Sequence, residues 1–207
     1  MTVTNLDENK ICNITMSRIG GAQINSITDP QDDREVTCAN LFFSLLDTLL
    51  AEHDWNWAMW EKTLTRDLDV DALRGFERAF RLPGDLIAGP FDVEGDGQQA
   101  NKGDYVILGA HVHASYKSVK VLYRRRPPVN IWPPFFVSLF VAAFAGQLCI
   151  PERDSVSMAD KFTEEAFGPP SLLRRGGLMG MAMKIDAQSK PTKTLFKNGD
   201  PFTATRY

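Results

Sequence analysis

Cysteines, histidines and long apolar runs are all scarce in this chain of 207 residues. Cys12, Cys38 and Cys149 are odd in number and far apart, so they predict neither a disulfide framework nor a zinc cluster. They favour a reducing compartment, such as the cytoplasm. The longest apolar run, residues 135–150, is shorter than the roughly 20 residues that a membrane-spanning helix needs. We therefore interpret this run as a buried helix and expect no membrane partner.

Recognisable catalytic and metal-binding motifs are also missing. Neither a G-x-S-x-G string nor an H-E-x-x-H string occurs. His111 and His113 share one face of a predicted strand, but no third ligand lies nearby in the sequence. The acidic stretch of residues 67–71 lacks the glycine and the glutamate that a calcium loop requires. The sequence therefore predicts no enzyme, no cofactor and no metal site.

Apolar residues at helical spacing predict most of the secondary structure. Asp29 and Pro30 are typical of a helix start, and the helix that follows carries an apolar stripe too wide to face one neighbour. Residues 172–185 are also predicted as helical, although glycines interrupt them and two prolines lie just before them. The four clearer helices are expected at about residues 8–19, 30–53, 134–150 and 155–167.

The middle third of the chain has a different pattern. Val119, Val121 and Tyr123 alternate with polar neighbours, and the preceding stretches are broken by glycine and proline. These features predict strands over about residues 61–126. The expected fold class is α+β, a helical bundle with an inserted antiparallel β portion, forming a single domain over residues 1–185.

Charge and composition set the C-terminal residues apart. Residues 1–60 carry nine acidic and three basic side chains, whereas residues 171–207 carry seven basic and two acidic ones. From residue 186 onward the chain is polar and basic with a few isolated anchors. We expect residues 186–207 to form an extended docking tail, the alternative being simple disorder. The side chains expected to bind a partner are Leu195, Phe196, Phe202, Arg206 and Tyr207.

Three of the four tryptophans lie together in the stretch HDWNWAMW, residues 53–60. A continuous helix would point Trp55 and Trp57 about 200° apart, so a flat stacking platform for bases or sugars is not favoured. We interpret Trp55, Trp57 and Trp60 as a junction that closes a core between bundle and β portion, with one indole exposed. On this interpretation Trp57→Ala lowers stability by several kcal/mol if the ring is buried.

Arg124, Arg125 and Arg126 end the last predicted strand and are followed by two prolines. Such a run can bind nucleic-acid phosphates or the carboxylates of a partner protein. The alternative is a solvated strand end. Both possibilities remain open from the sequence.

The order of these features resembles that of the tail tubular protein A family, the head-to-tail adaptors of short-tailed bacteriophages. The resemblance spans most of the chain and depends on the order and spacing of several segments. The chain departs from the family pattern at AFGPPSLLRRGG, which interrupts a late helix. The matching segments are MSRIGGAQINSITDP, AEHDWNWAMWEKTL, AFRLPGDLI, VKVLYRRRP, WPPFFVSLFVAAFAGQL and the final FTATRY.

The resemblance implies a structural, non-enzymatic virion protein at the head-tail junction, made in the host cytoplasm. It implies a homo-oligomeric ring, typically of twelve copies, between the portal protein and the tail nozzle, with genomic DNA passing through the lumen. Two other readings remain open. One is another head-completion or stopper connector, and the second is a nucleic-acid-binding module that uses the tryptophan and arginine clusters.

Overall fold

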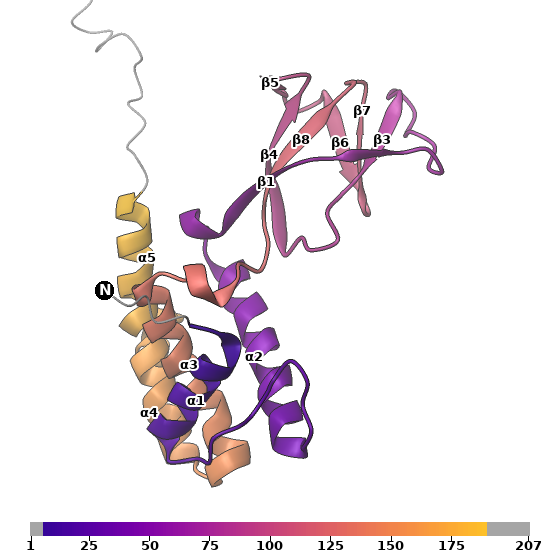
Figure 1. Cartoon of the computed structure of the whole chain (residues 1–207). Helices are drawn as coiled ribbons and strands as arrows, with labels where there is room; N and C mark the ends of the chain where they lie inside the picture. Colours follow the sequence, from indigo (N-terminus) through magenta and orange to yellow (C-terminus); the bar gives the residue numbers. More distant parts are fainter. Residues whose placement is uncertain (1–5, 190–207) are drawn as a thin grey trace, which may run out of the picture.

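The computed structural model describes residues 6–189, in which helices form a bundle and strands form two antiparallel sheets. The α+β class predicted from the sequence is confirmed. The β portion stands at one end of the bundle, beyond the C-terminal end of the second helix (Figure 1). The molecule therefore has two parts, which meet over a short stretch of chain.

The first two helices begin at aspartate caps. In α1 (Glu8–Ile19), the Asp7 carboxylate accepts the Lys10 N–H at 2.8 Å. In α2 (Asp33–Glu52), the Asp32 carboxylate accepts the Glu35 N–H at 2.8 Å, so the prediction that Asp29 caps this helix is wrong. Each cap satisfies a backbone donor that has no partner within its helix.

Buried Glu35 explains the later start of α2. Its carboxylate accepts backbone N–H groups from Asn25 at 2.8 Å, from Ser26 at 3.2 Å and from Gln31 at 2.7 Å. These hydrogen bonds hold residues 25–31 as a loop and keep the pKa of Glu35 below its usual value. The pattern that predicts a helix from residue 30 belongs instead to this anchored loop.

The centre of the bundle is α3 (Pro134–Arg153), which lies against α1, α2 and α4 (Val156–Phe167). Among the described helices, α3 alone is long and apolar enough to cross a membrane, by length and composition. The core helix of a soluble protein passes the same test, and 61% of the most apolar stretch of 18 residues in α3 is buried within the protein. A Cβ at Gly146 would lie 2.8 Å from Thr163 Oγ1. The close approach of α3 and α4 therefore depends on this glycine.

The last described helix, α5, spans Gly177–Ser189, not the predicted 172–185. A short 3₁₀ turn, η3 (Pro170–Leu172), and a tight loop precede it. Residues 186–189, predicted as the start of the tail, are helical. They look polar in the sequence, but the carboxylate of Asp186 is buried and hydrogen-bonded, as described below.

Residues 59–124 form what we call the β domain, whose eight strands make two four-stranded sheets. The strand orders are β1-β8-β4-β5 and β2-β3-β7-β6. Every pairing between these strands is antiparallel. The strands are β1 (Met59–Thr63), β2 (Thr65–Asp67), β3 (Arg78–Arg81), β4 (Ala88–Gly95), β5 (Gln98–Gln99), β6 (Tyr105–Leu108), β7 (His111–Ala114) and β8 (Val119–Arg124).

The bundle and the β domain have separate hydrophobic cores. Eight buried residues make the smaller core, which lies within the β domain. The stretch predicted as one domain over residues 1–185 therefore contains two packing units. The smaller core consists of Leu64, Phe80, Val93, Val112, Ala114, Val119, Val121 and Tyr123.

Candidate functional site: the joint between bundle and β domain

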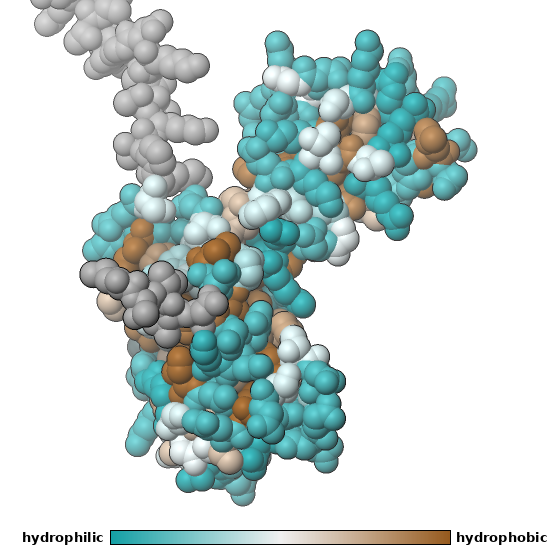
Figure 2. All heavy atoms as spheres, in the orientation of Figure 1, coloured by the Kyte–Doolittle hydropathy of each residue, from teal (hydrophilic) through white to brown (hydrophobic). Residues whose placement is uncertain are grey.

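The chain passes between bundle and β domain twice, and we call these two connections, residues 53–58 and 124–133, the joint. The first contains the 3₁₀ turn η1 (Asn56–Ala58), and the second contains η2 (Val129–Ile131). The molecule is visibly narrowed between its two parts (Figure 2). Both covalent connections between the two parts therefore run through these residues.

Trp55 fills the bundle side of the joint. Its side chain is completely buried, and its indole N–H donates to the Leu49 carbonyl at 2.7 Å. The ring packs edge-on against Phe136 with the centroids 5.3 Å apart. Because α2 ends at Glu52, the tryptophans do not continue its helical spacing. The interpretation of this cluster as a core closure holds for Trp55.

The other two tryptophans of the cluster have different environments. Trp57 is half-buried, with its ring centroid 4.7 Å from that of Phe136. Trp60 lies on β1 with 44% of its surface exposed, and the guanidinium of Arg125 lies 3.7 Å from its ring centroid. The condition for a large effect of Trp57→Ala, a buried ring, is met fully by Trp55 and only in part by Trp57.

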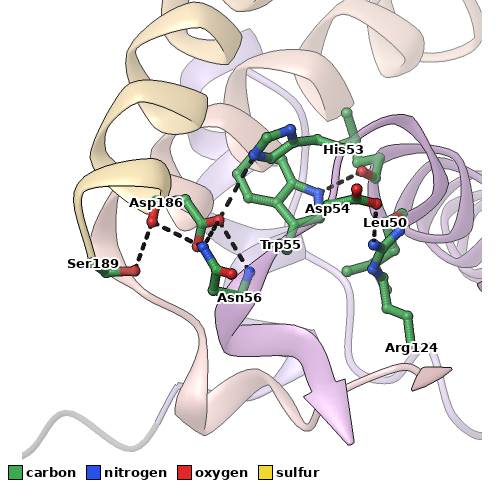
Figure 3. A network of polar contacts seen from close by, with 9 residues as sticks. Leu50, His53, Asp54, Trp55, Asn56, Arg124, Asp186 and Ser189 are labelled. Carbon is green, nitrogen blue, oxygen red and sulfur yellow. Dashed lines mark hydrogen bonds and ion pairs between the residues drawn. The ribbon is translucent and has the colours of Figure 1, made fainter. Parts of the chain in front are cut away.

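Arg124 is buried inside the joint, with 1% of its surface exposed. Its Nη1 donates to the Leu50 carbonyl at 2.6 Å, and its Nη2 donates to the Asp54 carboxylate at 2.8 Å (Figure 3). Its guanidinium also lies 4.8 Å from the Phe91 ring centroid. The prediction that Arg124 binds a partner is wrong, because its guanidinium is buried and both of its terminal nitrogens already donate to residues of the same chain.

The next two arginines also have partners within the chain. Arg125 Nη1 lies 3.6 Å from an Asp85 carboxylate oxygen. Arg126 donates from Nε and Nη2 to the two carboxylate oxygens of Asp47, both at 2.6 Å, and this ion pair raises the pKa of Arg126. Both side chains are partly exposed, so they brace the joint from its surface.

Helix α5 is attached to the joint through Asp186, which has 1% of its surface exposed. Its carboxylate accepts the backbone N–H and the side-chain Nδ2 of Asn56, each at 3.0 Å (Figure 3). The Asp186 carbonyl accepts Nδ2 of Asn56 at 3.0 Å and the hydroxyl of Ser189 at 2.6 Å. Sequence reasoning missed Asp186, because it assigned this residue to the tail.

His53 lies between these two networks. Its Nε2 is 3.7 Å from a carboxylate oxygen of Asp186. Its ring packs edge-on against that of Trp55, with the ring centroids 4.7 Å apart. Burial lowers the pKa of His53 below 6.5, Arg124 acts in the same direction, and the carboxylates of Asp186 and Asp54 oppose the shift. The imidazole is therefore neutral at pH 7.

We expect the joint to lose stability as the pH falls below about 6.5. The pKa of His53 is lower in the folded chain, so the unfolded chain binds the proton first and the folded state is disfavoured. The stability present above pH 6.5 is lost as the pH falls through the folded pKa. Denaturation midpoints at about pH 7.5 and about pH 5.5 measure this loss.

His53→Gln is the matched variant, because His111 and His113 remain in both proteins. The midpoint of the wild type should fall further between the two pH values than that of His53→Gln. Equal decreases would assign the pH dependence to groups outside the joint.

The other side chains that could bind a metal or act as nucleophiles are two histidines and three cysteines, and all of them are hydrogen-bonded or buried within the chain. His111 Nε2 lies 3.0 Å from the Asp67 carboxylate, and His113 Nδ1 accepts the Leu73 N–H at 3.1 Å. Among residues 6–189, no group of three His, Cys, Asp or Glu side chains is arranged to hold a metal ion. All three cysteines are buried, and burial raises the pKa of the Cys38 thiol to about 11.

The role of the joint is inferred from its own geometry. No protein-family model and no curated protein matches this chain. The joint brings together the tryptophan cluster and the arginine run, which the sequence treated as separate features. The five other predicted partner-binding residues, Leu195, Phe196, Phe202, Arg206 and Tyr207, lie outside the described residues.

Proposed function

We propose that this protein is a structural adaptor whose bundle and β domain bind different partners, as in the head-to-tail adaptors that the sequence resembles. The observation that carries the proposal is the braced joint. The buried Arg124 guanidinium links β8 to the last turn of α2, and Asp186 fixes α5 to the same connection. An adaptor that holds two partners in a fixed relative orientation needs hydrogen bonds of this kind across its joint.

Exposed apolar surface at the two ends of the molecule supports two separate binding faces. Strand β6 lies at the free edge of its sheet and exposes Val106, Ile107 and Leu108. It contains neither the charged residues nor the proline that usually protect an edge strand. At the opposite end of the bundle, Ile150 lies about 24 Å along α3 from its first residue and is exposed, as is Val156 at the start of α4.

On this proposal the chain assembles into a closed ring of identical copies between a portal protein and a tail nozzle. The resemblance implies about twelve copies in the ring. Such a ring requires two different, complementary surfaces on each subunit. Genomic DNA passes through the lumen without sequence recognition. The protein then belongs to the virion, at the head-tail junction, and has no catalytic role.

Electron microscopy of the purified protein mixed with a candidate portal tests this proposal. We expect rings stacked beneath the portal, with the opposite face of each ring free to bind the nozzle. A chain that stays monomeric and unbound at micromolar portal concentrations would contradict the proposal. A ring that stops further tail assembly would instead indicate a head-completion or stopper connector.

A nucleic-acid-binding module is the competing function. The partly exposed pair of Trp60 and Arg125 is the feature that favours it, because indole and guanidinium can both contact a nucleic acid. Arg124 cannot take part, since it is buried. This alternative predicts salt-sensitive binding of the isolated monomer to DNA. Absence of binding at low salt would eliminate it.

A further inference from the structure

Strand β6 has the composition of a central strand, although it lies at the free edge of its sheet. Its residues, YVIL, carry no charge. Val106 and Leu108 are exposed on one face of the sheet and Ile107 is exposed on the other. A short, continuous apolar run is typical of a strand that has neighbours on both sides. The composition of β6 therefore indicates that a further strand adds to it.

The opposite edge of the same sheet, β2, is also uncovered. A hollow of about 320 Å³ lies beside it, lined by the three residues of β2 and by Leu68, which is 80% exposed. The other sheet offers poorer edges, since β5 has only two residues and β1 carries the charged Glu61 and Lys62. The sheet β2-β3-β7-β6 is therefore the one whose two edges can both accept a further strand.

The two edges of this sheet run in opposite directions. The pairings of β2 with β3, of β3 with β7 and of β7 with β6 are all antiparallel, so β6 runs antiparallel to β2. A second copy placed beside the first in nearly the same orientation presents its β6 antiparallel to the β2 of the first. Such a contact joins two different surfaces and repeats from copy to copy, as a ring requires.

The faces of the two edges also match. The register of the sheet leads from Arg66 across the two central strands to Ile107, so these two side chains lie on the same face. Pairing Arg66 with Ile107 of a second copy continues that face and gives all three residues of β2 a partner in β6. The aliphatic part of Arg66 can pack on Ile107 while its guanidinium stays in water. Asp67 brings no unpaired carboxylate to the contact, because His111 Nε2 lies 3.0 Å from it.

We propose that β6 of one copy pairs antiparallel with β2 of the next copy, so that the sheets of neighbouring subunits join into one continuous sheet. Arg66 of one copy lies opposite Ile107 of its neighbour. The same contact covers the apolar edge of β6 and the hollow beside β2. The inference rests on the adaptor function proposed above, because it assigns the contact between neighbouring subunits of that ring.

Disulfide trapping in the full chain tests this pairing. Arg66→Cys mixed with Ile107→Cys should give, on mild oxidation, a covalent dimer that neither variant forms alone, since opposite residues on paired strands lie within disulfide range. Arg66→Cys mixed with Leu172→Cys is the control and should react at least tenfold more slowly, because Leu172 is exposed on the bundle. The native cysteines are buried in all three variants. Electrophoresis without reductant, followed by peptide mass spectrometry, identifies the pairing.

The outcomes separate this inference from the adaptor proposal. Equal rates in the two mixtures would overturn the pairing. A dimer formed by Ile107→Cys alone would also overturn it, because β6 would then pair with β6. Rings with portal that lack the disulfide would overturn the pairing and leave the adaptor proposal standing. The disulfide in a protein that does not bind portal would support the pairing and contradict the adaptor function.

A charge exchange tests the same contact without cysteines. Ile107→Lys should reduce ring formation at least tenfold, because it places a lysine opposite Arg66 of the next copy. Adding Arg66→Glu should restore the rings, since opposite charges then face each other. Leu172→Lys, on the bundle, should leave ring formation unchanged. Wild-type ring formation by Ile107→Lys, or no recovery in the double variant, would overturn the pairing.

Discussion

Replacing Trp55 with alanine is expected to lower the free energy of unfolding by about 3–5 kcal/mol. The side chain is completely buried, so its removal leaves a cavity beside Phe136. It also leaves the Leu49 carbonyl, in the last turns of α2, without the indole N–H that it accepts at 2.7 Å. Chemical denaturation at pH 7, followed by circular dichroism, measures the change.

The neighbouring tryptophans provide graded controls for this prediction. Trp57→Ala should have a smaller effect, because its ring is only partly buried. Trp60→Ala should cost the least, since the ring is 44% exposed and lies outside the bundle core. If Trp60→Ala lowered the free energy of unfolding as much as Trp55→Ala, the cluster would not stabilise the protein mainly through the bundle side of the joint.

The sequence predicted the helices whose signals are local. The bounds expected for the first helix are those of α1, because its apolar spacing, the Asp7 cap and the terminal Gly20 all lie within one stretch. The start of α2 was predicted wrongly, and the reason is again a contact between residues close in the sequence. Glu35 binds backbone groups up to ten residues earlier, and these bonds outweigh the local helix signal at residues 29 and 30.

The joint was harder to predict, because its contacts join distant parts of the sequence. Arg124 donates a hydrogen bond to the Leu50 carbonyl, 74 positions away, and Asn56 donates one to Asp186, 130 positions away. A run of arginines looks the same in a sequence whether its partners are within the chain or on another molecule. The acidic residues at 47, 54 and 85 were the available signal, but nothing in their spacing assigns them to the run.

Arg124→Met is expected to lower the free energy of unfolding by about 1–3 kcal/mol. Methionine keeps much of the aliphatic length of the side chain but loses both hydrogen bonds of the guanidinium. The main cost is the buried Leu50 carbonyl, which is left without this donor. Asp54 contributes less, because its side chain is 74% exposed and remains hydrated. Chemical denaturation measures the loss, and limited proteolysis should show faster cleavage at residues 53–58.

Arg126→Met is the matched control, because Arg126 makes a two-point ion pair with Asp47 at the surface of the same joint. Its loss should cost at most about 1 kcal/mol, since both side chains are partly exposed. The difference between the two variants measures how much the buried brace adds over an exposed one. If the adaptor proposal holds, Arg124→Met also yields fewer ordered rings with portal than Arg126→Met. Equal losses of stability would mean that burial of Arg124 adds nothing to the joint.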